Sequence, residues 1–156
     1  MEFLGNGKSS ELSANVSNSL YRALATGDIP AAWLLTKPLL ERSKMEKLSA
    51  STAFNCGLCL YQLNEYEKAL ASLRQAEQSL GTPPDLDTQE KKLFLQAVMA
   101  AQQVFLKPLD PENMKGLERY FLIRIRWLSA LCLLHLERQQ EAAPIIRFLA
   151  QYHIEL

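Results

Sequence analysis

Apolar residues recur at helical spacing along most of the chain, and Gly, Pro and Asn interrupt this pattern at intervals. Phe54, Leu58 and Tyr61, for example, are spaced i, i+4 and i+7, which places them on one face of a helix. Stretches of alternating Val, Ile and Thr are scarce, so strands are not expected. The pattern predicts an all-α protein with about seven helices and no sheet.

Residues that start or stop helices mark the ends of the predicted helices. Asp28 can cap a helix that has Pro30 in its first turn, and Gly81 closes another helix before Pro83. The predicted helices cover about 10–25, 29–42, 45–63, 66–80, 88–107, 110–136 and 139–152. Residues 1–9 are predicted to be a flexible N-terminus, and 10–156 to form one domain. Because the connections are short, consecutive helices are expected to pack antiparallel.

Two parts of the chain superimpose on each other without a gap. Residues 57–69 align with 130–142, at a shift of 73 residues (130 minus 57), so that Cys59 falls on Cys132 and Ala69 on Ala142. A shift of 37 residues (69 minus 32) places Ala32 on Ala69. These shifts are close to one and two lengths of a helical hairpin of about 34 residues. The three alanines are therefore expected to be buried where helices cross.

Residues 53–83 resemble a tetratricopeptide (TPR) repeat, with weaker copies at about 124–150 and 14–40. The positions of the family pattern hold Ala53, Cys56, Gly57, Leu60, Ala69, Leu73, Ala76 and Pro83. The resemblance implies an α-solenoid of helical hairpins, in which the first helix of each hairpin lines a concave groove. Seven helices cannot be simple alternating pairs with the last two in register, so either the chain breaks near Gly116, which gives eight helices, or the fifth helix is an insertion, and both alternatives stay open.

The resemblance also implies where a partner would bind. The groove positions that match this sequence are Tyr21, Phe54, Asn55, Leu58, Tyr61, Arg124 and Trp127. This apolar face either accepts a peptide or helix of a partner protein or is covered by the chain's own later helices. Some TPR proteins hold the C-termini of chaperones through Lys and Asn side chains, but Ser17 and Tyr21 stand at two of those positions. Such peptides are not the expected partner.

The expected function is a non-enzymatic protein-protein interaction module that acts as a scaffold, an adaptor or in a chaperone-like role. The alternative is a structural or regulatory helical domain that forms homodimers through the same apolar face. The pair Cys56 and Cys59 lies inside a predicted helix, where it favours core packing over redox chemistry. No hydrolase or nucleotide-binding motif is present, and no metal site, cofactor or catalytic residue is expected.

Charge and composition narrow the partner class further. Seventeen basic and seventeen acidic residues cancel, so neither nucleic acid nor an anionic membrane is expected as a partner. The small basic cluster of Arg119, Arg124 and Arg126 is interpreted as a contact for a partner or for carboxylates. The start of the chain does not resemble a secretory signal, and its longest apolar stretch is too short to span a bilayer. Together with three cysteines, these features predict a cytoplasmic protein.

Overall fold

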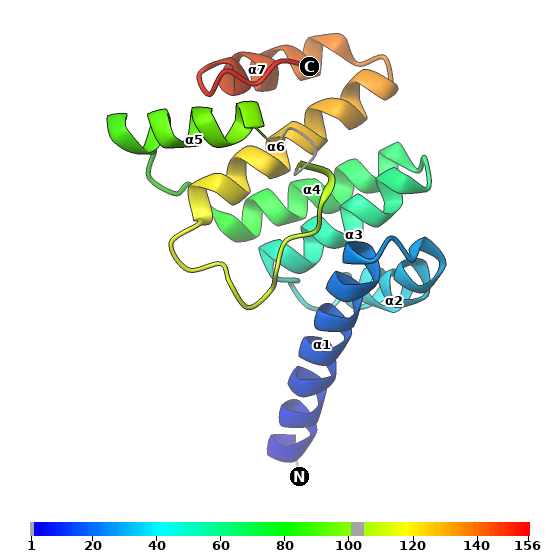
Figure 1. Cartoon of the computed structure of the whole chain (residues 1–156). Coiled ribbons are helices and arrows are strands. Elements are labelled where there is room, and N and C mark those ends of the chain that lie inside the picture. The colour runs from blue at the N-terminus through cyan, green and yellow to red at the C-terminus, as the bar shows by residue number, and fades with distance from the viewer. Residues whose placement is uncertain (1, 101–104) are drawn as a thin grey trace.

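A computed structural model describes the backbone of residues 2–100 and 105–156 and the side chains of residues 14–97 and 105–156. Over these residues the chain forms seven helices and no strand (Figure 1), which confirms the all-α prediction. The helices are α1 (Glu2–Ala25), α2 (Ile29–Arg42), α3 (Ala50–Gln62), α4 (Tyr66–Leu80), α5 (Thr88–Ala100), α6 (Glu118–His135) and α7 (Gln139–Ala150).

Local signals explain why α2 begins and α4 ends where the sequence predicts. The Asp28 carboxylate accepts the Ala31 N–H at 3.1 Å, which satisfies one of the free amides at the start of α2. Gly81 ends α4 with a φ of +77°, a backbone conformation that residues other than glycine rarely adopt. The ends of these two helices are therefore determined by neighbours in the chain.

Three predicted helix starts are wrong. Helix α3 begins at Ala50 and not near residue 45, because the Ser49 hydroxyl caps it by accepting the Thr52 N–H at 3.3 Å. Helix α6 begins at Glu118 and not near residue 110, because Gly116 breaks the run with a φ of +84°. Helix α1 begins at Glu2, so residues 2–9, predicted as a flexible terminus, continue its hydrogen bonding. Pro30 is the first proline of the chain, so no proline interrupts α1.

The helices pack mainly against their neighbours in the chain. The most extensive contacts join α3 to α4 and α4 to α6, followed by those that join α6 to α7 and α1 to α2, and fewer contacts join α2 to α3. Among the described residues α5 is the exception, since its backbone approaches the other helices at few points. Gly116 interrupts the chain without adding an eighth helix among the described residues, and α5 lies in the segment 81–117 between the two later pairs.

Small residues lie where α3 and α4 come closest. A Cβ atom on Gly57 would meet the Leu73 side chain at 3.0 Å and the Ala69 carbonyl oxygen at 3.3 Å, so a larger residue there would require these neighbours to shift. Ala32, Ala69 and Ala142 are all fully buried, as the alignment of the repeats predicts. The aligned cysteines Cys59 and Cys132 are fully buried as well.

Two clusters of buried side chains form the core. The larger one spans α1 to α4, Leu109, α6 and the start of α7, and the smaller one joins α6, α7 and the chain's last residues around Ile123, Leu149 and Tyr152. Among the described helices, none combines the length and the hydropathy that a bilayer span requires.

Candidate functional site

The residues predicted to form the groove lie on α1, α3 and α6, but most of them are covered. Phe54, Asn55, Leu58 and Arg124 are at most 3% exposed. Tyr21, Tyr61 and Trp127 are partly buried. The predicted groove is therefore not open at the four buried positions. We call the surface that Phe54, Asn55 and Arg124 form the α3–α6 face.

Residues 105–109, which we call the strap, cover the α3–α6 face. The Asn55 side-chain amide donates to the Leu109 carbonyl oxygen at 2.9 Å, and the Asn55 Oδ1 accepts the Leu109 N–H at 2.8 Å. One side chain thus satisfies both backbone polar groups of a buried residue. In Figure 1 the yellow-green chain that follows the grey trace runs past α3 before α6 begins.

Arg124 holds the other end of the strap. Its Nη2 donates to the Phe105 carbonyl oxygen at 3.2 Å and also to the Lys107 carbonyl oxygen. The guanidinium carbon lies 5.4 Å from the centre of the Phe54 ring and 5.7 Å from that of Tyr120, within the range of cation–π attraction. Asn55 and Arg124 together therefore make four hydrogen bonds to the strap, all of them to its backbone.

The Arg124 guanidinium is nevertheless incompletely satisfied. It is 3% exposed, and its Nε–H has no hydrogen-bond partner among the described residues. No carboxylate in the described part of the chain forms an ion pair with it. Burial lowers the pKa of Arg124 below its ordinary value, because the cation has lost its water. The face therefore contains a buried cation that retains one free donor.

The side chains of the strap point in two directions. Phe105 and Leu109 are buried, at 3% and 2% exposed, whereas Leu106 and Lys107 face solvent. The Phe105 ring lies 5.2 Å from that of Trp127 in the smaller cluster, and Leu109 belongs to the larger cluster. The strap therefore joins the two parts of the core through two apolar side chains.

An apolar cavity of about 560 Å³ lies beside the strap, between α5 and the start of α6. Phe94, Phe105 and Tyr120 line it together with Leu93 and Leu117. Leu93 is 60% exposed and Leu117 is 45% exposed, which is high for large apolar side chains. This is an exposed apolar surface beside the covered face.

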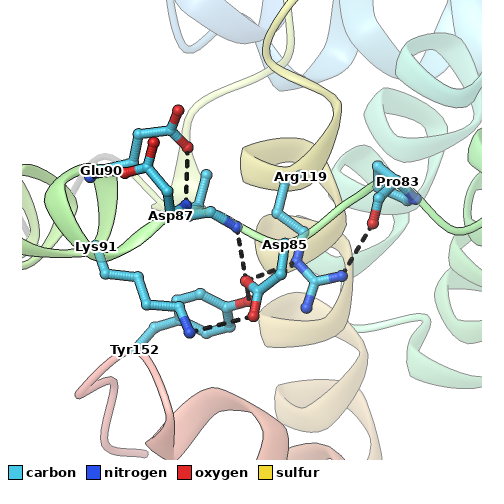
Figure 2. A network of polar contacts seen from close by, with 8 residues as sticks. Pro83, Asp85, Asp87, Glu90, Lys91, Arg119 and Tyr152 are labelled. Atoms are coloured by element: carbon cyan, nitrogen blue, oxygen red, sulfur yellow. Dashed lines mark hydrogen bonds and ion pairs between the residues drawn. The ribbon is translucent and has the colours of Figure 1, made fainter.

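A polar network fastens the segment before α5 to α6 and to the chain after α7, as Figure 2 shows. The Tyr152 hydroxyl donates to Asp85 Oδ1 at 2.5 Å, Arg119 Nε donates to the same hydroxyl at 2.9 Å, and Lys91 Nζ lies 3.1 Å from Asp85 Oδ2. The hydrogen bond from Tyr152, helped by Lys91, the Leu86 N–H and Arg119, lowers the pKa of Asp85 to about 2. The network positions α5 beside the cavity.

Sequence reasoning identified the arginines but not the residues that they contact. Arg119 contacts Asp85, Arg126 pairs with Glu77 at 2.9 Å, and Arg124 binds backbone carbonyl groups. Asp85 and Tyr152 were missed because 67 positions separate them and no local pattern links them. Phe105 and Leu109 were missed because the face binds their backbone groups. These groups are the same in nearly every residue, so no sequence pattern identifies them.

The cysteines pack as apolar residues. Burial raises the pKa of Cys56 and of Cys132 to about 12 and also raises the pKa of Cys59. Thiolates, which redox and metal chemistry need, are therefore scarce at neutral pH. His135 stacks on Tyr66 with ring centres 4.3 Å apart, and its Nε2 lies 3.4 Å from the Tyr61 hydroxyl. Across the described residues no three His, Cys, Asp or Glu side chains are placed to hold a metal ion.

No protein-family model, curated protein or solved structure matches the chain.

Proposed function

We propose that this chain is a non-enzymatic protein-protein interaction module, built as a TPR-like α-solenoid, that binds a peptide or helix of a partner on the α3–α6 face. Three features support a solenoid of hairpins: the successive helix pairs, the buried alanines at aligned positions, and the close approach of α3 and α4 at Gly57. In such an arrangement α3 and α6 are the first helices of neighbouring hairpins.

One observation carries the proposal. The face where a partner peptide was expected already holds a peptide segment, bound by four hydrogen bonds from Asn55 and Arg124 to its backbone. A surface that recognises backbone groups and encloses two apolar side chains has the chemistry of a peptide-binding site. No catalytic role is proposed for any residue.

Site-specific photo-crosslinking in extracts of the cells that express the chain tests this function. A benzophenone amino acid replaces Tyr61 or Trp127, which are partly buried beside the face. Leu34 on α2, 73% exposed, is the control position. We expect a discrete partner adduct from Tyr61 and Trp127 and none from Leu34. Equal labelling at all three positions, or no adduct from the two face positions, would reject the proposal.

A second candidate function is self-association through the apolar surface beside α5. Leu93 and Leu117 are exposed at the edge of the cavity, and a second copy of the chain would cover them. Sedimentation velocity over a wide concentration range tests this. A dimer that Leu93→Asp converts to a monomer supports self-association, and a monomer at every concentration excludes it.

A further inference from the structure

We infer that the strap occupies the place of the partner. The α3–α6 face binds a partner segment that resembles residues 105–109, and the strap competes with that segment. This inference rests on the function proposed above and specifies the partner of the same face. It starts from the fact that the strap is itself a peptide seated on that face.

The bonds to the strap would be equally available to another peptide. All four join Asn55 or Arg124 to backbone groups, which every peptide carries. Selection among segments is left to the two side chains that point inward, Phe105 and Leu109. The partner segment therefore has an aromatic or large apolar residue followed, four positions later, by a leucine-like residue.

The strap can leave the face without unwinding a described α-helix. It lies outside α5 and α6, and residues 110–117 after it form turns. In those turns the Asp110 carboxylate accepts the Glu112 N–H at 3.0 Å and the Asn113 amide at 2.7 Å, bonds internal to the loop. A side-chain bond from Asn18 to Glu112, 3.2 Å long and exposed, ties the loop to α1. Displacement therefore costs mainly the contacts of the strap itself.

Arg124 supplies the reason why a partner can outcompete the strap. Its buried Nε–H has no hydrogen-bond acceptor among the described residues. A partner segment that places an oxygen atom at this N–H gains a hydrogen bond that the strap does not make. The face therefore favours a segment that has this added acceptor beside the two apolar residues.

Fluorescence anisotropy with a synthetic peptide of residues 105–111, labelled and blocked at both ends, tests the inference. The peptide is titrated with the unchanged chain and with the double variant Phe105→Ser, Leu109→Ser, whose own strap is expected to bind the face more weakly. We expect the double variant to bind the peptide at least tenfold more tightly than the unchanged chain, and Asn55→Ala in that background to lose at least tenfold. A matched peptide with serine at both apolar positions is expected not to bind.

Equal affinity of the two chains for the peptide, or affinity that does not depend on Asn55, would overturn the inference. Hydrogen exchange on the unchanged chain gives a test that does not depend on the folding of a variant. We expect the Leu109 amide to exchange at least a hundredfold faster than that of Leu58 in α3. Equal protection of the two amides would mean that the strap leaves only on global unfolding, which contradicts competition. If the crosslinked adduct forms while the peptide does not bind, only this inference fails and the proposed function stands.

Discussion

The α3–α4 pair and the segment 81–117 are consecutive in the chain, yet different interactions hold them in place. Apolar packing holds the pair: Gly57 admits the Leu73 side chain, and Ala69 and Ala76 are fully buried. Hydrogen bonds and ion pairs from other elements help to hold the segment in place. Asn55 and Arg124 hold the strap, and Arg119 and Tyr152 hold Asp85.

The two regions differ in how many side chains hold them in place. Packed helices bury an apolar face against their neighbours, so many side chains contribute to their stability. The described part of the segment 81–117 combines polar contacts from its neighbours with the buried side chains of Phe105 and Leu109. We therefore expect the pair to respond to changes in volume and the segment to respond also to the loss of single hydrogen bonds.

The largest expected effect comes from removing the same atoms in both regions. Leu73→Ala in α4 removes a fully buried side chain and is expected to lower the free energy of unfolding by about 2–5 kcal/mol. Leu93→Ala in α5, where the side chain is 60% exposed, is the matched control and should change it by less than about 0.5 kcal/mol. Urea denaturation measures both. Similar losses in the two variants would contradict the comparison.

Overpacking the α3–α4 pair is expected to have the next largest effect. Ala69→Leu adds volume at a fully buried position where the Ala69 carbonyl already faces Gly57, and should cost about 1–3 kcal/mol. Ala71→Leu adds the same volume at an exposed position two residues later. Thermal unfolding followed by circular dichroism compares them. An unchanged melting temperature for Ala69→Leu would refute the assigned alignment of the repeats.

A smaller effect, dependent on pH, is expected in the segment 81–117. The pKa of Asp85 is about 2 in the folded chain and 3.8 as a reference, so its contribution is complete above about pH 4 and is lost as the pH falls through 2. Because the Asp85 side chain is 42% exposed, we expect Tyr152→Phe to cost only about 1 kcal/mol at pH 6. This cost should fall to about half near pH 3.

Denaturation at pH 6 and at pH 3 measures this change, with Tyr21→Phe on α1 as the control for a hydroxyl outside the network. A cost of Tyr152→Phe that stays constant between the two pH values would show that the hydrogen bond to Asp85 does not stabilise the segment.

The smallest expected effect is the very slow labelling of the cysteines in the native chain. Because burial raises the pKa of Cys56 and Cys132 to about 12, labelling of the native chain by a thiol reagent at pH 7.5 should be negligible within minutes. Labelling is expected to become complete in denaturant. Rapid labelling of the native chain would mean that the α3–α4 pair opens far more readily than its packing indicates.

The comparison of the two regions also explains which features could be predicted from the sequence. The ends of α2 and α4 were predicted correctly because Asp28 and Gly81 act on their immediate neighbours. The start of α6 was misplaced because Asp110 and Pro111 carry the local signature of a helix start, whereas the chain forms a turn there. Only the positive φ of Gly116, which the sequence left open, moves the start to Glu118.

The same limit applies to the candidate site. Asn55 and Arg124 were predicted as positions of a groove, and both are the residues that hold the strap. That the groove is covered could not be predicted, because Asn55 bonds to Leu109, 54 positions away, through backbone groups that all residues share. Periodic side-chain patterns reveal which helix faces are apolar, but they do not reveal which segment lies on them.

The long separation between Asn55 and Leu109 has a consequence during synthesis of the chain. Ribosomes add about 5–20 residues per second, so the 54 positions between these two residues correspond to a delay of about 3–11 s. Throughout this interval the nascent chain contains α3 but not the strap that will cover it. Because α6 follows the strap in the chain, Arg124 is synthesised later still, so the strap is already present when the α3–α6 face is completed, and a partner segment never meets the whole face without competition.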